Sequence, residues 1–479
     1  MKNAKMAVVV LVMLLLGVGT SFADGWIRTY GGSATDVGCS VAQTTDGGYI
    51  VAGFTYSFGT GDYPDVYLVK TDAAGDTVWT RTYGGSSYDW GKSVAQTTDG
   101  GYIIAGYTRS FGAGGDDIYL IKTDAAGDTV WTRTYGGSSY EWGLSVAQTA
   151  DGGYIIAGKT ESFGAGLEDV YLVKTDAAGD TVWTRTYGGS GSDVGYSVAQ
   201  TTDGGYIVVG YTKSFGAGEK DVYLIKTDAA GDTVWTRTYG GSERDGGESV
   251  AKTTDGGYII AGYTESFGTF DVYLVKTDAA GDTVWTRTYG GSSWDRGECV
   301  TQTTDGGYIV AGWTESFGTG AYPDVYLIKT EATGNAIWAR TYGGSLRDES
   351  FSIAKTSDGG YIVAGYTLSF GAGGDDVYLI KTDSAGYTAV NEPTGQKPVV
   401  LSLIAYPNPF NSSCVITAPA GAEIEIYDLL GNNVWSEVVP RSGPAEMVWT
   451  PDKSIASGVY LIRATLGEQR ATKKVVLIK

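Results

Sequence analysis

Histidine is absent from the 479 residues of this chain, and cysteine is scarce. The absence of histidine excludes Ser-His-Asp triads, imidazole acid–base catalysis and the commonest side-chain ligand of transition metals. The three cysteines, Cys39, Cys299 and Cys414, are odd in number and widely scattered. This spacing fits neither a disulfide framework nor a zinc site, so we interpret them as buried free thiols. The sequence therefore predicts neither a metal ion nor another cofactor.

Basic residues are also in short supply. The chain has 34 Lys and Arg against 54 Asp and Glu, which gives a net charge of −20. Binding to nucleic acid or to an anionic membrane depends on clustered positive charge. Neither is expected as a partner, and we interpret the acidity as a means of keeping the surface soluble.

A long apolar run, from Met6 to Val18, lies near the N-terminus and follows Lys2 and Lys5. The run is too short to cross a membrane comfortably, and it leads to the small-residue sequence Ser-Phe-Ala that ends at Ala23. This pattern predicts a secretory signal peptide over residues 1–23, cleaved after Ala23, with no membrane span in the mature chain. We therefore expect a protein that is secreted or displayed on the outer cell surface.

Glycine and tyrosine are abundant, with 74 and 35 residues, and they recur within a repeated unit that residues 131–182 show clearly. A fixed period of this length in a Gly-rich and Tyr-rich chain is typical of a repeat architecture. The tryptophan of the unit recurs seven times, at intervals of 50 to 53 residues, at Trp26, Trp79, Trp131, Trp183, Trp235, Trp285 and Trp338.

Each repeat is predicted to contain four strands. In the second repeat we expect them at Ser93–Thr97, Tyr102–Thr108, Ile118–Thr123 and Thr129–Tyr135, joined by glycine-containing hairpin turns. The second and third strands have apolar residues on both faces, as expected of a sheet that is covered on both sides. A propeller blade, which is covered by its two neighbours, fits this pattern.

Strand counting predicts how the ring closes. The fourth-strand sequence WxRTYGG, where x is any residue, occurs first at Trp26, before any first strand, and it is missing after the last third strand, Val377–Thr382. The N-terminal strand 26–31 should therefore complete the seventh blade. We predict an all-β fold with a seven-bladed propeller over residues 24–386. A solenoid is the alternative, but it would need capping repeats that are not visible.

The repeat ends at a predicted linker, residues 387–402, which contains Pro393 and Pro398. Residues 403–479 follow, with short alternating strands and Gly or Asn turns that predict a small β-sandwich. Four motifs stand out there: YPNPF at 406–410, IYDLLG at 426–431, SGVYLIR at 457–463 and TKKVVLIK at 472–479.

In order and spacing these motifs resemble the type A C-terminal sorting domain of the type IX secretion system. The resemblance implies an immunoglobulin-like domain that binds the export machinery and directs the chain across the outer membrane, for release or for attachment to the cell surface. The propeller part resembles uncharacterised bacterial β-propeller repeat proteins, which implies no activity. The sorting-motif residues are Pro407, Asn408, Pro409, Phe410, Asp428, Gly431, Gly458, Tyr460, Lys473 and Lys474.

Comparison of the repeats with one another predicts two different faces of the propeller. The TDGG and DAAGD turns hardly change and should share one face, whereas the loops between blades and between second and third strands differ and should share the other. Varied loops on a rigid frame commonly carry function, and aromatic faces suit sugar rings or a partner protein. The alternative is that the aromatics only pack on their neighbours. The candidate ligand-binding residues on the varied face are Tyr88, Trp90, Tyr140, Trp142, Arg244, Trp294, Arg296 and Arg347.

An acidic residue recurs once per repeat in these loops, and we expect it to cap a turn, because one carboxylate per loop lacks the dense oxygen ligands of a calcium site. The arginine of WTRTYGG is interpreted as structural because it does not differ between repeats. The recurrent acids are Asp36, Asp89, Glu141, Asp193, Asp245, Asp295 and Asp348.

The sequence therefore predicts an exported, non-catalytic binding or structural module, with carbohydrate or a surface protein as the possible ligand. No catalytic residue is proposed. Two alternatives stay open: a glycoside hydrolase with two carboxylates on the varied face, since that chemistry needs no histidine, and a surface-coat protein without a specific ligand.

Overall fold

The chain divides into two compact units, Met1–Gly395 and Gln396–Lys479, in the computed structural model. The boundary falls in the predicted linker, most of which lies outside the described residues, as do the predicted signal peptide and its cleavage site. Within the described part of the chain, no helix has the length and apolarity needed to cross a membrane. The structure describes residues 25–59, 61–388, 404–406, 408–418, 421–440, 446–466 and 469–479.

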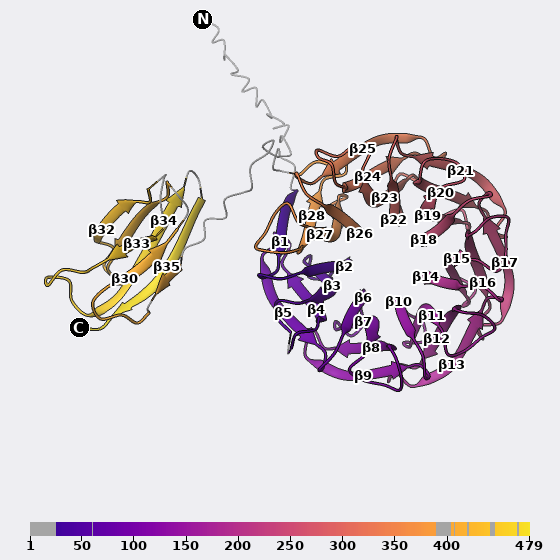
Figure 1. Cartoon of the computed structure of the whole chain (residues 1–479), viewed down its shortest axis with the longest axis horizontal. Helices are drawn as coiled ribbons and strands as arrows, with labels where there is room; N and C mark the ends of the chain where they lie inside the picture. The colour runs from indigo at the N-terminus through magenta and orange to yellow at the C-terminus, as the bar shows by residue number, and fades with distance from the viewer. Residues whose placement is uncertain are drawn as a thin grey trace, which may run out of the picture. The chain divides into compact units, whose positions relative to one another are not determined.

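The first unit is a ring of seven four-stranded antiparallel sheets, a seven-bladed β-propeller, as predicted (Figure 1). The first strand of each blade lies nearest the centre of the ring and the last strand lies at the rim. The first blade consists of β2 (Asp36–Gln43), β3 (Tyr49–Thr55), β4 (Asp65–Thr71) and β5 (Thr77–Tyr83). The next blades are β6 (Asp89–Gln96), β7 (Tyr102–Thr108), β8 (Asp117–Thr123) and β9 (Thr129–Tyr135); β10 (Glu141–Gln148), β11 (Tyr154–Thr160), β12 (Asp169–Thr175) and β13 (Thr181–Tyr187); β14 (Asp193–Gln200), β15 (Tyr206–Thr212), β16 (Asp221–Thr227) and β17 (Thr233–Tyr239); β18 (Asp245–Lys252), β19 (Tyr258–Thr264), β20 (Asp271–Thr277) and β21 (Thr283–Tyr289); β22 (Asp295–Gln302), β23 (Tyr308–Thr314), β24 (Asp324–Thr330) and β25 (Ala336–Tyr342).

The seventh blade joins the two ends of the repeat region, which confirms the predicted closure. Its strands β26 (Asp348–Lys355), β27 (Tyr361–Thr367) and β28 (Asp376–Thr382) are completed by the N-terminal strand β1 (Trp26–Tyr30). β1 pairs antiparallel with β28, with Trp26 opposite Lys381.

Burial explains why the middle strands of each blade are apolar on both faces. Every residue of β3 and β4 is buried, and Ile50 and Leu68 are completely inaccessible. Their side chains join those of the next blade, such as Val94 and Ile104, in one hydrophobic cluster. The core of the propeller is therefore a series of clusters between neighbouring blades.

The outer strands hold neighbouring blades together through a contact made at all seven junctions. The Tyr83 hydroxyl of the first blade donates a hydrogen bond of 2.6 Å to the Gly127 carbonyl of the next blade. Gly127 has a φ of 81° in the DAAGD turn, and a Cβ there would collide with the ring of Trp79. The constant Trp, Tyr and Gly of the repeat are thus explained by one interface between blades.

The first strand of each blade begins earlier than the sequence analysis expected. In the second blade it starts at Asp89, four residues before the predicted Ser93, and it has a β-bulge between Gly91 and Ser93. A bulge adds an unpaired residue and interrupts the alternation of side chains, so the sequence pattern predicts a loop where the first half of the strand lies. Trp90, and its counterparts Trp142 and Arg296, therefore lie on inner strands rather than in loops.

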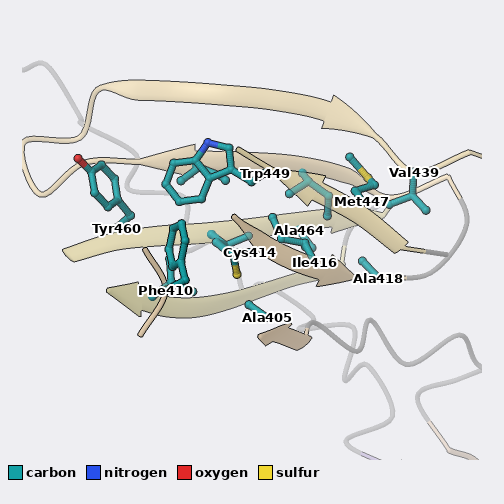
Figure 2. Packing of buried hydrophobic residues seen from close by; sticks show 14 of the residues in the cluster. Ala405, Phe410, Cys414, Ile416, Ala418, Val439, Met447, Trp449, Tyr460 and Ala464 are labelled. Carbon is teal, nitrogen blue, oxygen red and sulfur yellow. The ribbon is translucent and has the colours of Figure 1, made fainter. Parts of the chain in front are cut away.

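The second unit contains two antiparallel sheets around one core, whose packing Figure 2 shows. Trp449 and Phe410 are nearly inaccessible at its centre, with ring centroids 5.3 Å apart. The designation immunoglobulin-like stays a prediction. One sheet has β29 (Ile404–Tyr406), β30 (Cys414–Thr417) and β33 (Glu446–Trp449), and the other has β31 (Glu423–Tyr427), β32 (Asn433–Val438), β34 (Gly458–Leu466) and β35 (Gln469–Leu477).

Candidate functional site

The recurrent acids fix the loops of the varied face. Asp36 is completely buried, and its Oδ2 accepts hydrogen bonds from the Gly32 N–H at 2.7 Å and from the Ser57 hydroxyl at 2.6 Å. Its Oδ1 accepts a bond from Thr55. The contact to Gly32 is the capping role that the sequence predicted, and it makes the acid part of the frame.

Aromatic rings from the first three blades form a continuous stack on the varied face. Phe54 lies 3.9 Å from Trp90 between ring centroids, Trp90 lies 5.8 Å from Tyr107, and Tyr107 lies 5.0 Å from Trp142. The Lys159 ammonium ends the stack, 3.9 Å from the centroid of Trp142. We call these four rings the aromatic arc. Trp90 and Trp142 pack on neighbours, as the alternative interpretation expected, but both keep part of their surface accessible.

An open pocket of about 510 Å³ adjoins the arc at its first two rings. Lys92 places its ammonium 4.8 Å from the centroid of Trp90. The pocket is lined by Ala34, Thr35, Phe54, Tyr56, Trp90 and Gly374.

Tyr88 and Tyr140 lie on the loops beside the arc and are linked by one guanidinium. The Arg109 Cζ is 5.6 Å from the Tyr88 ring and 5.8 Å from the Tyr140 ring. Arg109 Nε donates to Asp116 Oδ1 at 2.7 Å, and Asp116 Oδ2 accepts from Trp142 Nε1 at 3.0 Å. The structure thus brings four of the predicted site residues into one polar and aromatic patch.

Arg244 and Trp294 belong to a second group, around the fifth and sixth blades. Trp294 is 56% exposed and packs against Phe270, with ring centroids 5.3 Å apart. Arg244 Nε lies 3.0 Å from Glu219 Oε2. Both residues line an open pocket of about 470 Å³ with Glu243, Glu265, Gly268, Thr269 and Phe270.

Arg296 occupies a position that sequence reasoning did not foresee, between two inner-strand carboxylates. Its Nη2 is 2.5 Å from Glu248 Oε1 and its Nε is 3.0 Å from Glu298 Oε1. Burial raises the pKa of Glu298 to about 7, against the lowering effect of Arg296 and with a further contribution from the negative charges of Glu248 and Glu349. Trp313 Nε1 donates to Glu298 at 3.3 Å.

Arg347, the last predicted site residue, pairs with Glu349, with 2.6 Å between Nε and Oε1. Burial raises the pKa of Glu349, and the positive charge of Arg347 opposes this. Arg347 lines neither pocket. The eight candidates therefore divide into the patch on the arc, the Trp294 pocket and two separate ion-pair groups.

Sequence reasoning missed the inner-strand position two residues after Trp90, and this position differs more between blades than the loops do. The signal is the variation of this position among the repeats, but the position lies between the flanks of the recurrent acid and the predicted start of the strand, where the sequence pattern indicates only a loop. The residues at this position are Cys39, Lys92, Leu144, Tyr196, Glu248, Glu298 and Phe351.

In the second unit, the two ends of the domain meet through sorting-motif residues. Asn408 Nδ2 donates to the Lys474 carbonyl at 3.0 Å, and Asn408 Oδ1 accepts from the Val476 N–H at 2.9 Å. The buried Tyr460 donates to the Ala456 carbonyl at 2.7 Å. Lys473, Lys474 and Pro409 are exposed, Gly458 begins β34, and Pro407 lies outside the described residues.

Comparison with known proteins identifies the C-terminal part. Residues 404–479 match the family model of the secretion system C-terminal sorting domain, which confirms the predicted resemblance. The regulatory protein FlaEY of Caulobacter vibrioides is 26% identical over 261 residues, which are 47% of this chain and 27% of that protein. The chain thus spans about a quarter of the length of this curated relative.

Solved structures similar to this chain are only distantly related in sequence. The WD40 domain of Neurospora crassa Pan2 is 8% identical, covering 73% of this chain and 89% of that one, with a TM-score of 0.45. A putative 6-phosphogluconolactonase of Bacteroides fragilis is 12% identical, covering 75% and 98%, with a TM-score of 0.44. Puromycin hydrolase is 13% identical, covering 81% of this chain and 59% of that one, with a TM-score of 0.45.

The sorting domain marks the chain for export, to the outside of the cell or to its surface.

Proposed function

We propose that this exported propeller is a carbohydrate-binding module whose ligand lies on the varied face, across the aromatic arc. The observation that supports it most is the stack of Phe54, Trp90, Tyr107 and Trp142 beside an open pocket. Phe54 and Tyr107 are buried and the rings cover one another's faces, so a sugar ring would pack on the accessible parts of Trp90 and Trp142. The polar groups of the sugar need nearby donors and acceptors.

Polar side chains beside the arc supply such groups. Lys92 lies over Trp90, Arg109 lies over Tyr140, and Thr35 and Tyr56 line the pocket with their hydroxyl-bearing side chains. Because the chain carries a net charge of −20, an acidic polysaccharide would be repelled. We therefore expect a neutral glycan.

The route to the ligand is part of the proposal. The predicted signal peptide, cleaved after Ala23, would take the chain across the inner membrane, and residues 403–479 would bind the type IX machinery at the outer membrane. Without a membrane span in the mature chain, the propeller would then be released or attached to the surface through the export process.

The experiment is a glycan array with the purified chain, comparing the Trp90→Ala/Trp142→Ala double variant with the Trp294→Ala variant. Trp294 is the matched control because it is an accessible tryptophan of the same face that belongs to the other pocket. We expect the double variant to lose at least about tenfold in affinity, since buried aromatic contacts dominate such sites, while Trp294→Ala changes little. Thermal unfolding of each variant checks that the fold is kept.

Undiminished binding by the double variant would contradict the proposal. Binding to an unrelated surface protein, and to no glycan, would replace carbohydrate by a protein partner. Absence of any ligand would favour the surface-coat alternative.

A second candidate, a glycoside hydrolase, rests on Glu248 and Glu298. These carboxylates are bridged by Arg296, and the raised pKa of Glu298, about 7, fits a general acid whereas Glu248 would act as the base or nucleophile. Hydrolysis of a polysaccharide that the wild-type chain performs and the Glu298→Gln variant does not would establish it. Binding without hydrolysis would leave the module non-catalytic.

A further inference from the structure

A tight turn between β31 and β32 presents two leucines at the surface of the sorting domain. Asp428 Oδ1 accepts hydrogen bonds of 2.9 Å from the N–H groups of Leu430 and Asn432. The Gly431 N–H donates to the Asp428 carbonyl at 3.1 Å, and Gly431 has a φ of 83°, which requires glycine. The turn is therefore fixed by Asp428, Gly431 and backbone bonds, and the leucine side chains contribute to none of them.

The propeller contains the same turn in almost every blade, with small residues in place of the leucines. In the first blade Asp72 Oδ1 accepts bonds of 2.9 Å from the N–H groups of Ala74 and Asp76. The Gly75 N–H donates to the Asp72 carbonyl at 3.2 Å, and Gly75 has a φ of 82°. An Asp-Ala-Ala-Gly turn thus forms in this chain without leucine, so the leucines of the sorting domain are not required by the turn.

The two leucines are exposed although the domain has a complete core. Leu430 is 88% exposed and Leu429 is 71% exposed, and no large apolar side chain in the described part of the chain is more accessible than Leu430. Exposure of leucine to water is unfavourable, and two neighbouring exposed leucines at the tip of a turn indicate a site that a partner covers.

We propose that Leu429 and Leu430 are the residues by which the sorting domain docks into an apolar groove of the export machinery. The identity of the partner follows from the family match, because residues 404–479 match the model of a domain that a secretion system sorts. The turn offers a preformed shape, so docking orders no flexible segment and its apolar burial is not offset by that entropy. The proposal rests on the sorting domain and is independent of glycan binding.

The experiment expresses the full chain in a bacterium with a working type IX system and measures the fraction of the propeller outside the cell. The Leu429→Ala/Leu430→Ala variant carries the turn sequence of the propeller itself. Its exported fraction should fall at least about tenfold, since two buried leucines contribute strongly to a contact, with unchanged thermal unfolding. A Leu429→Met/Leu430→Met variant, which stays apolar and flexible, should restore export.

The matched control is Val438→Ala/Val448→Ala, which removes two side chains of the same domain that are each 58% exposed. Its export should equal that of the wild type. The proposal is overturned by normal export of the alanine variant, by equal loss in the valine control, or by unfolding of the alanine variant, which would make the leucines structural. A dimeric wild type that the alanine variant converts to a monomer would also overturn it, because a second copy would then cover the leucines.

Discussion

Replacement of Asp324 by Asn is expected to stabilise the propeller at neutral pH, because this residue faces another carboxylate inside a blade junction. Asp324 Oδ2 accepts a bond of 2.6 Å from the Thr319 N–H, whereas its buried Oδ1 has no hydrogen-bond partner within the described structure. A Cβ added to Gly343 would collide with both Asp324 Oδ1 and Asp348 Oδ2, so the two carboxyl groups lie close to each other beside this glycine. Asp348 is itself held by the Ser369 hydroxyl at 2.6 Å.

The sign of the effect follows from the pKa of Asp324. Burial, and then the negative charge of Asp348, raise this pKa from 3.8 to about 6 against the hydrogen bonds from Thr319. The folded chain therefore binds this proton more tightly than the unfolded chain, and the resulting stabilisation is complete below about pH 4 and is lost as the pH rises through about 6. At 1.36 kcal/mol for each pKa unit, the loss between these limits is about 2–3 kcal/mol.

The Asp324→Asn variant has no charge to lose, and its amide can donate to Asp348. We expect it to match the wild type near pH 4 and to exceed it by about 2–3 kcal/mol at pH 7. Urea unfolding followed by tryptophan fluorescence across this range measures both. The control is Asp46→Asn: Asp46, although partly desolvated, is held by Lys70 and Thr44, which lower its pKa to about 2, so that variant should lose stability at pH 7. A pH-independent difference between Asp324→Asn and wild type would refute the reasoning.

Four further substitutions test the contacts between blades by denaturant unfolding. Lys252→Gln and Lys355→Gln should each raise the free energy of unfolding by about 0.5–1 kcal/mol, the contribution of a single hydrogen bond. Elsewhere in the ring, Gln at this position accepts a backbone N–H of the preceding blade. An unchanged free energy of unfolding would contradict this role of the glutamine. Cys299→Ser should raise the free energy of unfolding by about 0.5–1.5 kcal/mol, because the Ile353 N–H would gain a hydroxyl acceptor. At the preceding junction the Val300 N–H already donates to the hydroxyl of Ser249. Arg296→Met should cost about 3–5 kcal/mol at pH 8, because it leaves Glu248 and Glu298 buried without their cation. The cost should shrink at pH 6, where Glu298 with a pKa of about 7 takes up a proton; an equal cost at both pH values would contradict this.

The sequence predicted the propeller, its seven blades and its closure because these depend on features that every repeat shares. Tyr102–Thr108 and Thr129–Tyr135 were predicted with the bounds that β7 and β9 have, since regular strands keep the alternation of side chains. The inner strand was shortened in the prediction because its bulge interrupts that alternation at Gly91.

The candidate site was predicted less completely for a related reason. The repeats show which residues differ, but they do not show which side chains meet across blades that are 50 residues apart. The contact of Arg296 with Glu248 and the stack of Phe54 on Trp90 both join different blades. Tyr107, which links the two tryptophans of the arc, occupies a strand position that is Tyr in four of the seven repeats, and the sequence does not show that its ring meets both tryptophans.

Differences between repeats also make the ring unequal in its junctions, and the weakest one is not where the chain ends meet. At the closure, the Val41 N–H donates to Ser352 at 3.1 Å, the Ser357 N–H donates to Gln43 at 2.7 Å and Tyr30 donates to Gly75 at 2.6 Å. Between the sixth and seventh blades, the serine is replaced by Cys299 and the glutamine by Lys355. The junction where the chain ends meet thus has the full set of contacts, and the noncovalent closure itself lies within the seventh blade, where β1 pairs with β28. The junction between the sixth and seventh blades lacks this serine and this glutamine, and its inner strands carry the carboxylates of Glu298 and Glu349, so we expect it to open before the junction at the chain ends.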